Sequence, residues 1–317
     1  MSKYSVTANE LRLRSTPDSQ TNRNIIAVLS NGQLVEKIAS GGSDWWEVKT
    51  NLSGTTSATG FVAHRFLHEV TIAQSESTIS TTIPTSTHAP DLTSFVTPVH
   101  LMENKVNVTR KLTTGRAYPL GEPNRPSRGG SSVEKACSSI HSIIEWINVE
   151  QSARYTPNST STYCNIYAHD YCYLNGVFLP RVWWTSRALI ELNLRNRVPI
   201  QYGQTVNELN ANNLLRWLLE WGNDFGWRRV FELNELQAEA NLGHVCIISA
   251  RNVNENSSGH ICAVVPENDL HKATRNVDRS VRIPLQSQAG RVNKKYFNNS
   301  LWWLTRTFAD FGYFVHD

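Results

Sequence analysis

The sequence predicts an α+β protein made of a small all-β unit (residues 1–70), a linker (71–95) and a larger α+β unit (96–317). Short alternating apolar runs, separated by frequent turns, predict the first unit. Ten of the twenty residues from Thr71 to Pro90 are Ser or Thr, which leaves too little apolar surface for a fold and predicts a linker. In the larger unit, helical periodicity precedes short β-branched runs, as expected for helices packed on an antiparallel sheet.

In the first unit, four runs predict the strands of a small barrel: "NELRLRSTP", "IIAVLSNGQLVEKIA", "DWWEVKT" and "ATGFVAHRFL". Their order resembles that of bacterial SH3-like domains, which implies a binding module of the kind that docks on peptidoglycan peptides. Trp45, Trp46 and Phe61 are the aromatic candidates for its groove. Strand alternation predicts that one tryptophan of the pair faces the core and the other faces solvent, and packing of both in the core is the alternative.

In the larger unit, a capping box predicts a helix over "SSVEKACSSIHSIIEWINVE", because Ser131 lies three residues before Glu134. Cys137 recurs with the apolar residues of this stretch at helical spacing, so we expect it in the core. Further helices are expected from Cys164, near Thr185, over "NANNLLRWLLEWGN" and over "ELNELQAEANLG". The runs "HVCIISA", "GHICAVVPE" and "VRIPLQSQAG" predict the strands of the sheet.

The composition limits the location and the partners of the chain. A net charge of +4 is mildly basic, which suits an acidic partner such as a bacterial wall polymer, and a solvated surface with no special partner is the alternative. The opening "MSKYSVTANELRLRS" lacks the apolar core of a signal peptide, and no stretch reaches the length of a membrane span. Five cysteines, an odd number, predict folding in a reducing compartment. We therefore expect synthesis in the cytoplasm without a signal peptide, no nucleic-acid partner and no membrane span.

Cys164, in "TSTYCNIYAHDYCYLNG", is the candidate nucleophile. A thiol attacks as the thiolate, and the unpaired N–H groups at the start of a helix lower the thiol pKa. Ser and Thr residues before Cys164 are candidate caps that place it in the first turn, whereas Cys172 lies about two turns deeper and is expected in the core. A zinc site is the competing interpretation, but Cys164, His169 and Cys172 are spaced around the helix rather than toward one ion.

A cysteine nucleophile needs a base that is near in space. His260 begins a strand directly after a polar loop, and His244 has the same position one strand earlier. His169 lies five residues after Cys164 and points away from its face of the helix. Gln286 and Gln288 alternate onto one face of the next strand, so either can orient the base.

A cysteine that opens a helix, a "GHICAVV" strand and a polar residue on the following strand resemble the papain-like bacterial cell-wall hydrolases. These are the NlpC-type endopeptidases and the cysteine- and histidine-dependent amidohydrolases/peptidases. The resemblance implies a papain-like fold with Cys164 as nucleophile, His260 as general base and Gln288 or Gln286 as the orienting residue. It implies acyl transfer with the oxyanion held in part by the N–H of Cys164, and Tyr163 is a candidate further donor. No cofactor and no metal ion are expected.

His260 lies 96 positions after Cys164, which is further than a minimal member of these families needs, and the segment between them is rich in Trp. Trp183 and Trp184 are therefore candidates for a substrate groove, with core packing as the alternative. The expected function is hydrolysis of an amide bond in the peptidoglycan stem peptide, targeted by the SH3-like module. The protein then acts on the cell wall or in the periplasm as a phage-type lysin or an injected antibacterial effector, with an immunity protein or a delivery apparatus as further partners. The alternatives are a cysteine protease or transferase with a protein substrate, and a non-catalytic wall-binding protein.

Overall fold

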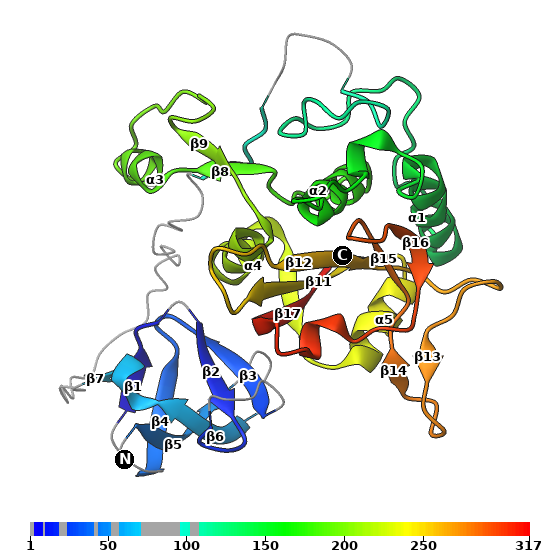
Figure 1. Ribbon diagram of the computed structural model, residues 1–317. Helices are drawn as coiled ribbons and strands as arrows, with labels where there is room; N and C mark the ends of the chain where they lie inside the picture. The colour runs from blue at the N-terminus through cyan, green and yellow to red at the C-terminus, as the bar shows by residue number, and fades with distance from the viewer. Residues whose placement is uncertain are drawn as a thin grey trace, which may run out of the picture. The chain divides into compact units, whose positions relative to one another are not determined.

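The computed structural model describes residues 3–8, 10–18, 24–40, 44–51, 57–70, 96–101 and 108–317. The chain divides into two compact units, Met1–Pro90 and Asp91–Asp317 (Figure 1). The linker predicted over 71–95 lies outside the described residues. Within them the protein is α+β, because the first unit holds an antiparallel sheet and the second combines α-helices with further sheets.

In the first unit, the described strands form one antiparallel sheet in the order β3-β2-β6-β5-β4-β1-β7. They are β1 (Lys3–Val6), β2 (Glu10–Arg14), β3 (Ile25–Ser30), β4 (Leu34–Ser40), β5 (Trp45–Asn51), β6 (Ser57–Ala63) and β7 (Leu67–Val70), with the 3-10 turn η1 (His64–Phe66) before β7. Every second side chain of a strand faces the same side, so Leu13, Leu29, Val35, Val48 and Val62 meet in one core.

Trp45 and Trp46 open β5, and both are half-buried. Trp46 packs against the core and stacks on His64, with 5.0 Å between the two ring centroids. The Lys37 ammonium lies 3.7 Å from the centroid of the Trp46 ring. Val48, two residues further on, is fully buried, so alternation places Trp46 on the core side and Trp45 on the opposite face.

The second unit is built on a six-stranded antiparallel sheet in the order β10-β17-β11-β12-β15-β16. These strands are β10 (Trp227–Val230), β11 (Val245–Asn252), β12 (His260–Val264), β15 (Gln286–Gln288), β16 (Lys294–Phe297) and β17 (Phe308–His316). Two small sheets pair β8 (Val182–Trp184) with β9 (Val206–Glu208), and β13 (Thr274–Arg275) with β14 (Val281–Ile283). The strand predicted over "VRIPLQSQAG" is divided between β14 and β15, because Pro284 lies between them and has no N–H for a ladder.

The α-helices of the described residues are α1 (Val133–Ile147), α2 (Cys164–Leu174), α3 (Ser186–Asn193), α4 (Ala211–Glu220) and α5 (Leu233–Asn241), with the 3-10 turns η3 (Ala153–Tyr155), η4 (Gly222–Phe225) and η5 (Trp302–Leu304). α1 begins one residue later than predicted, since Ser132 rather than Ser131 caps it by accepting from the Lys135 N–H. Cys137 is half-buried rather than in the core, and its thiol donates to the Asn241 carbonyl. Not one of these helices combines the length and the apolar character needed to span a membrane.

α2 is the central helix of the second unit, and it packs on β12 (Figure 1). Its buried residues join α1, α4 and one face of the sheet in the main core, for example through Ile144, Tyr167, Leu215 and Ala263. Because α2 begins at Cys164 and β12 begins at His260, this packing decides whether the two candidates meet.

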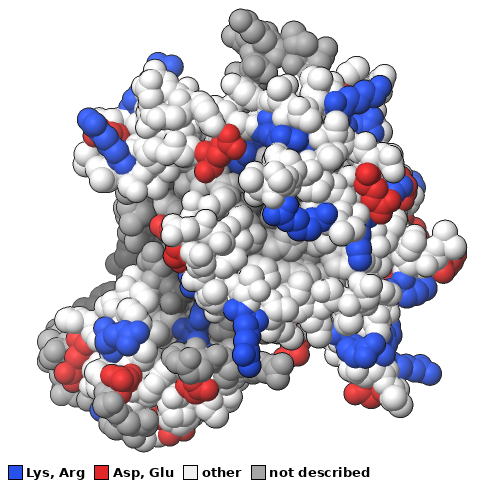
Figure 2. Space-filling view, in the orientation of Figure 1, with Lys and Arg blue, Asp and Glu red and all other residues white. Residues whose placement is uncertain are grey.

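On the face in view, Figure 2 shows Lys and Arg side chains of the second unit scattered among uncharged residues rather than gathered in one band.

Candidate active site

Cys164 is the first residue of α2 and is only 2% exposed. The N-cap residue is Tyr163, which makes no side-chain cap hydrogen bond, so the predicted Ser or Thr cap is wrong. Because no side chain satisfies the first N–H groups of the helix, they remain available to a negative charge. The sulfur of Cys164 accepts hydrogen bonds from the N–H groups of Asn165 and Ile261, so α2 and β12 both stabilise a thiolate.

His260 hydrogen-bonds to the thiol of Cys164 from the first position of β12. Its Nε2 lies 2.7 Å from Oε1 of Gln288. The amide nitrogen of Gln288 donates to the Val292 carbonyl at 3.2 Å, which turns the amide oxygen toward His260. Nε2 therefore carries a proton and donates to Gln288, which leaves Nδ1 as the nitrogen available to exchange a proton with the thiol. The structure brings Cys164, His260 and Gln288 together in one hydrogen-bonded row.

Burial opposes the charging of Cys164 and of His260, and their pairing outweighs it. Burial raises the pKa of the Cys164 thiol, but the charge of His260, its hydrogen bond and the two N–H groups bring that pKa below its ordinary value. Burial lowers the pKa of His260, but the Cys164 thiolate and the hydrogen bonds to it and to Gln288 raise it above its ordinary value. These opposite shifts favour a thiolate–imidazolium pair near neutral pH.

Gln286, the other candidate orienting residue, hydrogen-bonds to Trp302, which packs against His260. Its Oε1 accepts from Nε1 of Trp302 at 3.0 Å, and its Nε2 donates to the Ser300 carbonyl at 3.1 Å. The ring of Trp302 meets that of His260 edge to face, with centroids 4.5 Å apart. Sequence reasoning missed Trp302, because nothing in its local pattern links it to a histidine 42 residues earlier.

His244, the second candidate base, lies at the opposite end of β11 from this row. Ala250 of β11 pairs with His260, whereas His244 precedes Val245 at the start of the strand. Six residues of strand correspond to about 20 Å, so the two histidines belong to different sites.

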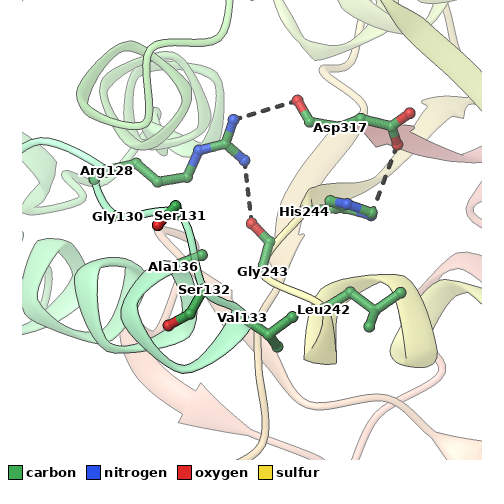
Figure 3. Close-up of a pocket in the computed structure, with 11 residues that line it drawn as sticks. Arg128, Gly130, Ser131, Ser132, Val133, Ala136, Leu242, Gly243, His244 and Asp317 are labelled. Atoms are coloured by element: carbon green, nitrogen blue, oxygen red, sulfur yellow. Dashed lines mark hydrogen bonds and ion pairs between the residues drawn. The ribbon is translucent and has the colours of Figure 1, made fainter.

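His244 instead lines a cavity of about 310 Å³ at the start of α1, together with Arg128 and Asp317 (Figure 3). Its Nδ1 lies 2.6 Å from Oε2 of Glu239. Among the residues that the structure describes, Glu239, His244 and Asp317 form the one group whose ligand atoms converge enough for a metal ion. Arg228 already pairs with the Glu239 carboxylate at 2.7 Å and with that of Asp317 at 3.7 Å, so an ion-pair network accounts for this cluster.

His169 and Asp170, two polar residues further along α2, are buried in the core. His169 bonds through Nδ1 to a main-chain carbonyl at 2.6 Å, and Asp170 forms a buried ion pair with Arg154. Burial raises the pKa of the Cys172 thiol, as expected for a core cysteine. Cys164, His169 and Cys172 therefore do not converge on one point.

The remaining candidates of the second unit have structural contacts. Trp183 and Trp184 are 6% and 8% exposed and belong to the main core, so the structure places them in the core and not at a groove. Tyr163 is half-buried, its hydroxyl accepts from Asn158, and the Arg116 guanidinium lies 3.6 Å from its ring centroid.

We expect iodoacetamide to alkylate Cys164 before any other cysteine at about pH 6, because alkylation requires the thiolate. Burial raises the pKa of the other four thiols, those of Cys137, Cys172, Cys246 and Cys262. Peptide mass mapping after brief exposure measures the order of labelling. In His260→Ala the preference should disappear, and earlier labelling of the half-buried Cys137 in the unaltered protein would contradict the prediction.

Acid is expected to destabilise the protein through His169. Burial lowers the pKa of its imidazole from 6.5 to about 4; Asp170 and a carbonyl partner oppose this shift, and Arg181 and His100 add to it. Between these values the unfolded chain binds more protons than the native one, so the free energy of unfolding falls by about 3 kcal/mol as pH drops from 6.5 to 4. Urea titrations at several pH values measure this slope. It should be shallower in His169→Asn, and equal slopes would show that other groups cause it.

No protein-family model, no curated protein and no solved structure matches the chain. Its function must therefore be inferred from the chemistry of its own residues. Their central feature is a thiol at the start of a helix, hydrogen-bonded to a histidine that an amide oxygen orients.

Proposed function

We propose that the chain is a peptidoglycan hydrolase that cleaves an amide bond of the stem peptide through an acyl-enzyme on Cys164. The observation that supports this most is the row of Cys164, His260 and Gln288, whose pKa shifts favour a thiolate beside an imidazolium. Such a pair suits nucleophilic acyl transfer. A helix that begins with the cysteine and packs on an antiparallel sheet is also what a papain-like hydrolase domain would require.

The proposed reaction has two steps. The Cys164 thiolate attacks the amide carbon, and the carbonyl oxygen takes the charge near the N–H of Cys164, which has no partner within the helix. The C–N bond then breaks as Nδ1 of His260 gives its proton to the leaving amine, which leaves a thioester and a neutral imidazole. In the second step Nδ1 takes a proton from water, whose oxygen attacks the thioester and releases the carboxylic acid and the thiolate. Gln288 holds the ring in one orientation throughout.

The first unit fits this proposal as an SH3-like module that docks on wall peptides, with Trp45 as the tryptophan on the face opposite to the core. On this proposal the protein works on the cell wall or in the periplasm after release as a lysin or injection as an effector. An immunity protein or a delivery apparatus would then be its protein partner.

Hydrolysis of purified peptidoglycan tests the proposed function. The unaltered protein should release new amino groups, and Cys164→Ala should release none. Cys137→Ala is the matched control, because it removes a half-buried thiol on α1, and it should keep the rate. Mass analysis of the fragments identifies the bond.

Each other outcome has a distinct meaning. Release of amino groups by Cys164→Ala would overturn the nucleophile. Wall binding without release would favour a non-catalytic wall-binding protein. Cleavage or modification of protein substrates alone would favour a cysteine protease or a transferase.

A further inference from the structure

Arg116 is a half-buried arginine that contacts the residue preceding the candidate nucleophile. Its guanidinium carbon lies 3.6 Å from the ring centroid of Tyr163, the residue directly before Cys164. Its Nε and one terminal nitrogen donate to the main-chain carbonyls of Arg154 and Ala153, at 2.8 and 3.3 Å. These bonds fix the side chain in place but leave its positive charge uncompensated.

The neighbouring buried cations differ from Arg116 in having acidic partners. Arg154 pairs with Asp170 at 2.6 Å, and Arg181 pairs with Glu208. No carboxylate within the described part of the chain lies at ion-pair distance from Arg116. Burial lowers the pKa of Arg116, and the positive charge of Arg154 contributes to the same shift. A half-buried charge of this kind is stabilised when an anion from outside reaches it.

We propose that Arg116 binds a carboxylate of the substrate next to the scissile amide, and thereby selects anionic stem peptides over their amidated forms. This inference rests on the proposed function. Because Arg116 lies over the ring of Tyr163, and Tyr163 directly precedes Cys164 in the chain, a carboxylate bound by Arg116 would belong to a group near the scissile amide rather than to a distant part of the substrate.

The guanidinium has the donors for this role. It carries five N–H groups in a planar fork that matches the two oxygens of a carboxylate. The two carbonyls take two of these donors, and the Tyr163 hydroxyl takes at most one more, so at least two remain for a ligand.

Two synthetic stem peptides that differ only in a carboxylate or a carboxamide beside the scissile amide test this role. The unaltered protein should show a kcat/KM about 10-fold or more higher for the carboxylate peptide, in line with a charge-assisted hydrogen bond. In Arg116→Gln the preference should disappear, mainly through a higher KM for the carboxylate peptide, and Arg116→Lys should keep part of it. Arg125→Gln is the control, because Arg125 is exposed, donates to the Glu122 carbonyl and lies over the ring of Tyr173, and the preference of this variant should be unchanged.

The ratio of the two rates separates recognition from folding, since a misfolded fraction lowers both rates equally. Equal rates in the unaltered protein, or a preference that survives in Arg116→Gln, would overturn the role of Arg116 while the hydrolase proposal stands. Failure of the unaltered protein to cleave either peptide or whole peptidoglycan would overturn the proposed function, and this inference with it.

Discussion

His260→Ala should lower kcat/KM for the cleaved amide by about 10⁴-fold. The substitution removes the charge that lowers the pKa of Cys164 and the group that protonates the leaving amine. Initial rates of amine release measure the effect. His244→Ala is the matched control, because His244 lies at the far end of β11, and its rate should stay within about twofold of the unaltered protein. Retention of a tenth or more of the activity in His260→Ala would contradict the assignment.

The pH dependence of kcat/KM should be bell-shaped, since the thiolate and the imidazolium are both required. The acid limb reports loss of the thiolate and should lie below 9.0, the ordinary value for a thiol. The alkaline limb reports loss of the imidazolium and should lie above 6.5, the ordinary value for histidine. Because the bond to Gln288 raises the pKa of His260, Gln288→Ala should move the alkaline limb to lower pH, whereas Gln286→Ala should leave it in place.

Asp170→Asn should lower the free energy of unfolding by about 3–5 kcal/mol. The Asp170 carboxylate and the Arg154 guanidinium are both fully buried, with Nε to Oδ2 at 2.6 Å and a second bond at 3.2 Å. Tyr155 also donates to this carboxylate at 2.8 Å. Removal of the negative charge leaves a buried cation without compensation, and urea unfolding near pH 7 measures the cost.

Two further variants distinguish the loss of this ion pair from a non-specific effect of substitution on stability. Asp278→Asn, on the exposed loop between β13 and β14, should leave the urea midpoint unchanged. A double change, Arg154→Met with Asp170→Leu, removes both charges and should recover much of the stability lost in Asp170→Asn. An unchanged midpoint in Asp170→Asn would show that this pair contributes little.

The start of α2 could be predicted from sequence because helix position is a local property. The residues around Cys164 were enough to predict that it lies in the first turn of a helix. They did not predict the cap correctly, because Tyr163 is the N-cap residue and makes no side-chain cap hydrogen bond. The choice between Gln286 and Gln288 could not be made, because both project from one face of β15. Only the register separates them: Gln286 pairs with Val264, the last residue of β12, and the antiparallel pairing places Gln288 nearer to His260, the first residue of that strand.

The non-local contacts could not be predicted, because residue type does not identify a distant partner. Asp170 and Arg154 are 16 residues apart in a chain with 31 basic and 27 acidic residues, so their pairing has no mark in the sequence. Trp183 and Trp184 posed a different problem, because a core and a ligand groove both use large apolar side chains. Their near-complete burial in the structure shows that both tryptophans are part of the core.

The most direct test of the Cys164 acyl-enzyme is acid quenching during turnover of a synthetic stem peptide, followed by peptide mass mapping. The peptide between Arg154 and Arg181 contains both Cys164 and Cys172, so fragment ions must locate the added mass. We predict a thioester-linked acyl fragment on Cys164 and none on Cys172. Hydrolysis that proceeds with the acyl fragment on another residue, or that is unaffected by prior alkylation of Cys164, would contradict the account.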